Sequence, residues 1–266
     1  MKVRDSFTTA GGSRSNEDRV GHAGPLAWVI DGATDLYDDA ALPAERDVVW
    51  LVDLVGSLLT DAGTDGYQGN GADLLEQIAV EVQRRQESYG FPPDRMPPAC
   101  SIGLCIDQGD GFELTRIGDA TAVIDGNATH VLATDYFDGR EAAAVRARET
   151  DPAKVVAAMQ QRRRHTMTSG DVESVFSGHP QRRLVAHRIV ADWAGTGHIL
   201  LCTDGFARLV TDYQLFPGWP EVVAEARERG MAYLEQLIRQ TESDPAVGGD
   251  RFKRADDVAA VLISAG

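Results

Sequence analysis

The spacing of hydrophobic positions changes several times along the chain. Apolar and polar residues alternate over 3–7, which predicts a half-buried strand, and the apolar run at 26–30 predicts a second one. Residues 44–60 and 72–83 carry apolar side chains at helical spacing instead. We therefore expect two strands followed by two helices in the first third of the chain.

Short apolar runs separated by turn residues occupy the middle of the chain. Four of them, at 101–106, 112–117, 121–124 and 129–133, are separated by Gly-Asp and Asp-Gly pairs. Because such pairs are typical of tight turns, the four runs predict an antiparallel meander.

The remaining sequence predicts more helices and two further strands. Residues 139–163 and 219–241 have helical composition, whereas 164–197 is irregular and basic. The apolar runs at 198–203 and 258–264 predict buried strands. Strands grouped in meanders, with helices gathered in pairs, favour an α+β fold over a parallel doubly wound sheet.

Composition narrows the class of protein. Of 266 residues, 43% are hydrophobic and 25% are charged, which is typical of a globular protein and excludes a disordered chain. No stretch has the composition of a linker, so we expect a single domain over 1–266. The chain has 26 basic and 41 acidic residues, and the net charge of −15 argues against a nucleic-acid partner.

The apolar runs and the cysteines predict where the protein is found. No run of 18 apolar residues occurs, so we expect no membrane span, and the first residues lack the apolar stretch of a signal peptide. Cys100, Cys105 and Cys202 stand inside apolar runs without metal-binding spacing. We interpret them as reduced core residues of a cytoplasmic protein.

Carboxylates stand at the ends of several predicted strands, often beside a glycine. The positions are Glu17, Asp18, Asp31, Asp119, Asp204 and Asp256. One Asp-Gly pair after a strand is commonly just a turn, but several at the ends of buried strands favour a shared site. Converging carboxylates repel one another unless a cation lies among them, and Mg²⁺ and Mn²⁺ prefer oxygen ligands. Two such ions form a common centre for phosphoester hydrolysis.

Five segments carry these acids in a fixed order. They are SRSNEDR at 13–19, WVIDG at 28–32, RIGDATAVI at 116–124, LLCTDGFARLV at 200–210 and ADDVAAVLIS at 255–264. The ordered set resembles the motifs of the metal-dependent protein phosphatases of the PPM or PP2C type. This resemblance implies two packed antiparallel β-sheets flanked by pairs of α-helices, with a dinuclear Mn²⁺ or Mg²⁺ centre at one end.

The resemblance also implies roles for individual residues. Asp31 would bridge two metal ions, and the carbonyl of Gly32 would ligate one of them. Asp204 and Asp256 would complete the ligands of the first ion. The implied reaction is direct attack on phosphorus by a metal-bridging hydroxide, with a phosphorylated protein as the substrate.

Other matched positions have supporting roles in the resemblance. Glu17 and Asp18 would act mainly through metal-bound water, and Asp119 together with Asp204 matches a third, weaker metal position. Arg14 corresponds to the arginine that binds the substrate phosphate, although it lies three residues before Glu17 where the pattern has four.

The sequence departs from the family pattern at several positions. Ala33 stands where some members have a histidine that acts as a general acid, and Asp257 replaces the usual asparagine. The segment 135–190 departs most, in the region where family members carry a flap near the substrate. We therefore expect the family's substrate preference to be the property that applies least to this protein.

Several basic residues allow more than one interpretation. The arginines of the irregular region could recognise an acidic phosphosubstrate, but we favour a solvated role for Arg162, Arg163, Arg164, Arg182 and Arg183. His165 and His179 could take part in proton transfer, although lone histidines are commonly incidental.

Two other functions compete with a phosphatase of this type. A catalytically weak or inactive regulatory module on the same fold would bind phosphoproteins without hydrolysing them. A haloacid-dehalogenase-type phosphatase would need an aspartate two residues before Asp31, where the chain has Val29. The sequence predicts no oligomeric state.

Overall fold

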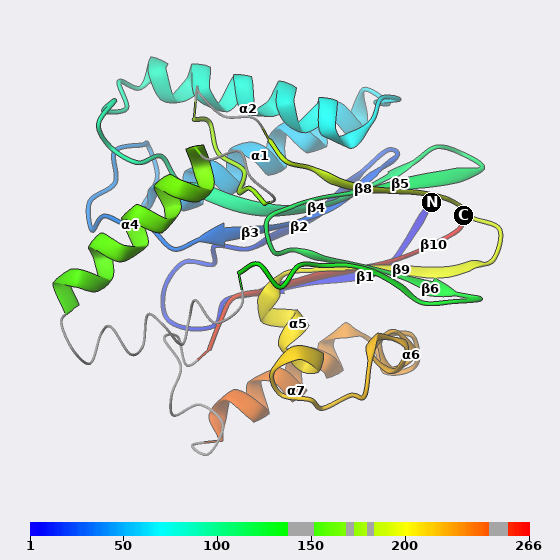
Figure 1. Cartoon of the computed structure of the whole chain (residues 1–266). Helices are drawn as coiled ribbons and strands as arrows, with labels where there is room; N and C mark the ends of the chain where they lie inside the picture. The colour runs from blue at the N-terminus through cyan, green and yellow to red at the C-terminus, as the bar shows by residue number, and fades with distance from the viewer. Residues whose placement is uncertain (138–151, 169–172, 180–183, 245–254) are drawn as a thin grey trace.

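Two antiparallel sheets are stacked face to face between layers of helices (Figure 1). The structure, a computed structural model, describes residues 1–137, 152–168, 173–179, 184–244 and 255–266. One sheet has the strand order β2 (Arg19–Ala23), β3 (Leu26–Ala33), β4 (Ala99–Asp107), β5 (Gly111–Ile117) and β8 (His187–Asp192). The other has the order β1 (Lys2–Thr9), β10 (Val258–Ser264), β9 (Thr196–Cys202), β6 (Thr121–Gly126) and β7 (His130–Leu132). The α+β prediction, with two packed antiparallel sheets, is confirmed.

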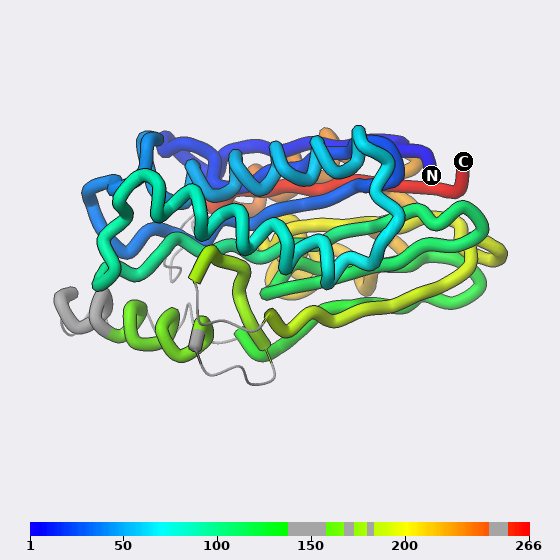
Figure 2. Tube along the Cα trace, turned by 90° about the horizontal axis from the view of Figure 1, so that it is seen from above, coloured from blue at the N-terminus to red at the C-terminus, as the bar shows by residue number. Residues whose placement is uncertain are grey.

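Helices cover the two outer faces of this sandwich. On the first sheet lie α1 (Asp47–Thr64) and α2 (Gly71–Ser88); on the second lie α5 (Asp204–Thr211), α6 (Trp219–Arg229) and α7 (Met231–Ser243). Helix α4 (Pro152–Thr168) lies at the end of the sandwich away from the two chain termini, as both views show (Figures 1 and 2). Across the described residues, no helix combines the length and apolar character that a membrane span requires.

The apolar side chains form three layers because successive residues of a strand point to opposite faces. In β3, Trp28 and Ile30 pack against α1, whereas Ala27 and Val29 pack against the second sheet. Strands β9 and β10 divide their side chains in the same way between the second helix layer and the inter-sheet layer. Because these strands are buried on both faces, they appear in the sequence as continuous apolar runs.

The predicted meander is wrong at its centre. Strands β4 and β5 pair as expected, but β6 belongs to the other sheet, where it pairs with β7 and β9. The short connection after β5 carries the chain from one sheet to the other, through Gly118 at a φ of 80°. Since the central strands of both sheets are buried, hydrophobic spacing alone could not show to which sheet each strand belongs.

Three elements were not expected from the sequence. Edge strand β8 lies within the stretch interpreted as irregular, and its residues alternate between half-buried and exposed, but the exposed Val190 is apolar, so the alternation does not show in the sequence. Strand β2 and the eight-residue helix α5 are too short to show a clear period. The helix expected over 139–163 is described from Pro152 and continues to Thr168, and its first part lies outside the described residues, as do parts of 135–190.

Gly118→Ala should destabilise the fold at the crossover between the sheets. A Cβ there would lie 2.1 Å from the Ser101 hydroxyl oxygen, and φ is positive. We expect the free energy of unfolding to fall by about 3 kcal/mol, from the left-handed backbone together with the overlap. Gly109→Ala is the matched control, because it has φ of 92° but open space around it; urea denaturation should show a loss of only about 1 kcal/mol. Equal losses at both positions would contradict this reading.

Candidate active site

The strand order brings acidic residues from distant parts of the sequence to one end of the sandwich. Alternate residues of a strand point to the same face, so Asp31 lies on the face of β3 that also carries Ala27 and Val29. Its side chain therefore lies between the two sheets. Asp204 follows β9 and Asp256 precedes β10, and these strands pair antiparallel, which places both acids at the same end. Asp119 occupies the crossover from β5 to β6.

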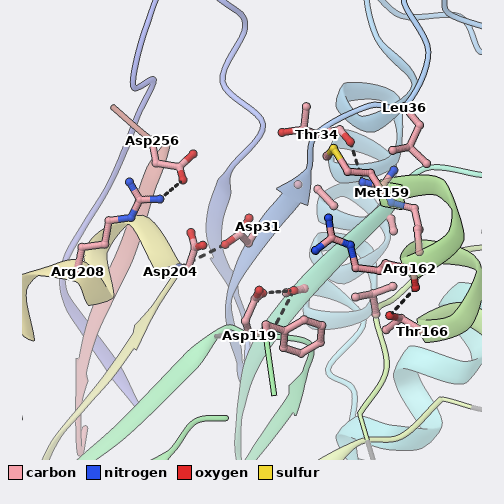
Figure 3. A pocket seen from close by; sticks show the side chains of 17 residues that line it. Asp31, Thr34, Leu36, Asp119, Met159, Arg162, Thr166, Asp204, Arg208 and Asp256 are labelled. Atoms are coloured by element: carbon pink, nitrogen blue, oxygen red, sulfur yellow. Dashed lines mark hydrogen bonds and ion pairs between the residues drawn. The ribbon is translucent and has the colours of Figure 1, made fainter. Parts of the chain in front are cut away.

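These four carboxylates line one pocket of about 320 Å³ (Figure 3). Gly32 lies in its wall, and a Cβ at that position would come within 2.5 Å of the Glu17 carbonyl oxygen. The glycine therefore allows β3 to pass close to the segment that carries Glu17 and Asp18. Both of these acids are buried.

The carboxylates are close enough to raise one another's pKa. Burial raises the pKa of Asp31 well above its ordinary value, and the negative charges of Asp204, Asp18, Asp119 and Asp256 raise it further.

Asp18 behaves in the same way. Burial is the main cause of its raised pKa, with smaller contributions from the charges of Asp204, Asp256 and Asp257, while a hydrogen bond from Thr203 acts in the opposite direction. The cluster is thus an environment in which added positive charge is strongly favoured.

The metal-free protein should lose stability as the pH rises. An aspartate whose folded-state pKa is raised binds more protons folded than unfolded, so folding weakens from the unfolded pKa of about 4 up to the raised value. We expect urea denaturation in chelator to show this decline. Asp31→Asn should flatten it, because the amide does not ionise. A decline of the same slope in the variant would contradict the assignment to Asp31.

Neighbouring groups hold the individual acids in place. The backbone N–H of Asp204 donates to Oδ2 of Asp31 over 3.3 Å. The Ser101 hydroxyl donates to Asp119, whose own N–H donates back to Ser101 Oγ over 3.2 Å. Ser101 faces Asp31 across the β3–β4 pair, so this hydroxyl links the two sides of the pocket.

Asp257 holds the loop that leads to Glu17. Its carboxylate accepts hydrogen bonds from the N–H of Gly11 (2.8 Å) and the N–H of Glu17 (2.6 Å). The Glu17 carboxylate in turn pairs with Arg46 of the segment before α1. The acid found in place of the family's asparagine therefore orders the backbone beside the cluster.

Two arginines of α4 line the pocket, and Arg162 lies on the side opposite Asp256 (Figure 3). The side chain of Arg162 extends into the pocket. Arg163 donates from Nη2 to the carbonyl oxygen of Thr34 over 2.7 Å, and burial lowers its pKa to about 10. Arg163 thus fastens α4 to the loop after β3, and the solvated role favoured for both arginines does not describe their surroundings.

Arg14 is not brought to the pocket of the carboxylates. It lines a separate pocket together with Asp35 and Arg46, near the start of α1. The phosphate-binding role expected for Arg14 therefore lacks support from the geometry. This agrees with its position in the sequence, which is one residue away from that of the family's arginine. His165 is exposed on α4 and His179 lines another pocket, so neither histidine reaches the carboxylates.

Comparison with solved structures identifies the architecture. Stp1, a serine/threonine phosphatase from Staphylococcus aureus, matches over 100% of this chain and 96% of its own, with 14% identity and a TM-score of 0.60. The phosphatase PstP/Ppp of Mycobacterium tuberculosis matches over 97% and 95%, with 17% identity and a TM-score of 0.58. The fold is PP2C-like. PppA, described as a regulatory component of the type VI secretion system of Pseudomonas aeruginosa, matches over 99% of both chains at 17% identity and a TM-score of 0.58.

Sequence comparisons return no such match. No protein-family profile matches the chain, and no curated protein sequence matches it. Identities of 12–18% to the solved structures mean that the likeness lies in the fold. The catalytic domain of PstP has been solved in complex with two manganese ions, at 18% identity and a TM-score of 0.58.

The donor atoms of the acidic cluster are of the chemical kind that a hard divalent cation prefers. All are oxygens, and Asp18 Oδ2 is buried with no hydrogen-bond partner among the described residues, a costly state that a cation would relieve. In the described part of the chain, however, no three acidic, histidine or cysteine side chains are grouped to hold an ion. The Asp256 carboxylate is instead engaged by Arg208, at 2.7 Å.

Arg208 is the site residue that sequence reasoning missed. It lies four residues after Asp204 on α5, and residues at this spacing share one face of a helix. That spacing was the available signal, but it is informative only once α5 is known to be a helix.

Proposed function

We propose that this protein is a metal-dependent phosphomonoester hydrolase that removes phosphate from phosphoserine or phosphothreonine in proteins. The observation that carries the proposal is the convergence of Asp31, Asp119, Asp204 and Asp256 on one pocket, within a fold shared with serine/threonine phosphatases.

In this proposal the carboxylates hold divalent cations. Asp31 and Asp204 are the central ligands, with the Gly32 carbonyl, Asp18 and Asp256 completing them and Asp119 offering a further, weaker position. Bound Mn²⁺ or Mg²⁺ would supply an ionised water near neutral pH and neutralise the phosphoryl oxygens. Glu17 would orient this arrangement through its ordered backbone and its pairing with Arg46.

Arg162 would bind the phosphoryl group from the opposite side of the pocket. A guanidinium group donates two parallel hydrogen bonds to phosphate oxygens, which fixes the orientation of the phosphorus toward the carboxylates. Arg163 would keep α4 in position through its bond to Thr34. Since Ala33 offers no proton and the described pocket wall contains no histidine, the leaving oxygen would take its proton from water.

The choice between phosphate esters tests this assignment. A monoester presents two negative charges and a free set of oxygens to Arg162 and the cations, whereas a diester presents one charge. Each lost charge-assisted hydrogen bond costs about 1.5–3 kcal/mol, or roughly tenfold or more in rate. With Mn²⁺ present, p-nitrophenyl phosphate should therefore be hydrolysed at least about tenfold faster than bis(p-nitrophenyl) phosphate. Preference for the diester would contradict the proposal.

A second candidate is a regulatory protein that binds phosphoproteins without hydrolysing them. The Arg208–Asp256 pair favours it, because a ligand position is taken by an internal cation. Binding of a phosphopeptide without phosphate release, in protein shown to be folded and supplied with Mn²⁺, would support this candidate over the hydrolase.

A further inference from the structure

Arg208 introduces a buried positive charge into the acidic cluster. Its side chain is 7% exposed and Asp256 is 14% exposed, and Nη2 of the guanidinium lies 2.7 Å from Oδ2 of Asp256. Both residues line the pocket that also contains Asp31, Asp119 and Asp204 (Figure 3).

The short helix α5 fixes where this guanidinium lies. Asp204 is the first residue of α5 and Arg208 is one turn later, so both residues lie on the same face of the helix, and both line the pocket. The carbonyl of Arg208 accepts the N–H groups of Asp212 (3.3 Å) and Tyr213 (2.8 Å), which closes the end of the helix. The backbone that carries the guanidinium is therefore held on both sides.

A structural role alone is a weak explanation for this pair. Buried ion pairs commonly contribute little to stability compared with apolar residues of the same volume, because both charges lose their hydration. Here the surroundings are acidic, so the guanidinium supplies positive charge where several carboxylates would otherwise repel one another. A divalent cation at the same end of the cluster would also supply positive charge there.

We propose that Arg208 is a tethered cation that competes with a divalent metal ion for Asp256. Metal binding at this end of the cluster requires the guanidinium to leave the carboxylate, so Arg208 weakens that metal position without changing its ligands. The inference rests on the proposed function only in treating Asp256 as a metal ligand. The position that Arg208 weakens is the one that Asp256 completes.

The test is calorimetric titration of Mn²⁺ into metal-stripped protein without substrate. Arg208→Met has a similar volume and no charge, and we expect its Mn²⁺ dissociation constant to be at least about tenfold lower than that of the wild type. Arg208→Gln keeps a hydrogen-bond donor for Asp256 and should also bind Mn²⁺ more tightly. If circular dichroism shows that Arg208→Met does not fold, the titration of Arg208→Gln is the test.

Arg162→Met is the matched control. It removes the same charge from the same pocket, but from the side opposite Asp256. We expect its Mn²⁺ affinity to stay within about twofold of the wild type. Equal tightening in Arg162→Met would mean that general electrostatics is responsible and would overturn the competition, as would unchanged or weaker binding in both Arg208 variants.

Metal affinity and phosphate release are measured separately, so the two proposals can fail separately. Tighter Mn²⁺ binding in the Arg208 variants of a protein that hydrolyses no phosphate ester would uphold the competition and remove the hydrolase. Phosphate release by a wild-type protein whose Arg208 variants bind Mn²⁺ no more tightly would do the reverse.

Discussion

Asp31→Asn is expected to lower Mn²⁺-dependent phosphate release by about 1000-fold, because several kcal/mol of charge stabilisation at the reacting phosphate depend on the cations that this carboxylate would hold. The folded state should not suffer. Burial and neighbouring carboxylates raise the pKa of Asp31, so its ionised form destabilises the metal-free protein, and the neutral amide relieves that cost. The variant can still accept the hydrogen bond from the Asp204 N–H.

Initial rates of phosphate release and urea denaturation, measured on the same preparations, check both halves of this expectation. Asp61→Asn serves as the control, since Asp61 is an exposed residue near the end of α1 that packs against Ala23, at the turn of the β2–β3 hairpin away from Asp31. It should leave both the rate and the stability near the wild-type values. A fully active Asp31→Asn protein would remove this residue from the reaction.

Arg162→Ala is expected to lower kcat/KM for a phosphothreonine peptide by about 10- to 100-fold. The side chain extends into the pocket opposite the acids, and loss of charge-assisted hydrogen bonds to phosphate costs about 1.5–3 kcal/mol. Inhibition by inorganic phosphate should weaken in parallel, since the product carries the same oxygens.

Arg14→Ala distinguishes this assignment from the one suggested by the family pattern. Arg14 lies in a different pocket, so its loss should change kcat/KM by no more than about twofold. Arg164→Ala, an exposed neighbour on α4, controls for damage to the helix. If Arg14→Ala lowered kcat/KM and Arg162→Ala did not, the assignment of phosphate binding to Arg162 would be wrong.

The fold could be predicted where strands are fully buried. Runs such as 26–30 and 198–203 are apolar on both faces, and the acids that follow them lie within a few residues of the strand ends. The division of strands between two sheets could not be predicted in this way, because β5 and the first four residues of β6 are all buried and only a short connection that begins at Gly118 separates the two strands. Edge strand β8 could not be predicted either, because an apolar residue, Val190, stands at one of its exposed positions.

The acids of the candidate site were easier to find than its cations. Asp31, Asp119, Asp204 and Asp256 stand at strand ends that can be recognised from one sequence, and the structure brings all four to one pocket. Arg162 and Arg208 lie on helices, and which face of a helix meets a pocket depends on packing between elements distant in sequence. Arg14 is the opposite case, since it is near Glu17 in sequence but lines a different pocket from the one lined by the four aspartates.

The most direct test of the central claim is phosphate release from a phosphothreonine peptide as Mn²⁺ is added to metal-stripped protein. We expect no release above background without metal, a saturable rise as Mn²⁺ is added, and a return to background when chelator is supplied. The same rate in chelator as in Mn²⁺, or no release at any Mn²⁺ concentration from folded protein, would contradict the account of this protein as a metal-dependent phosphatase.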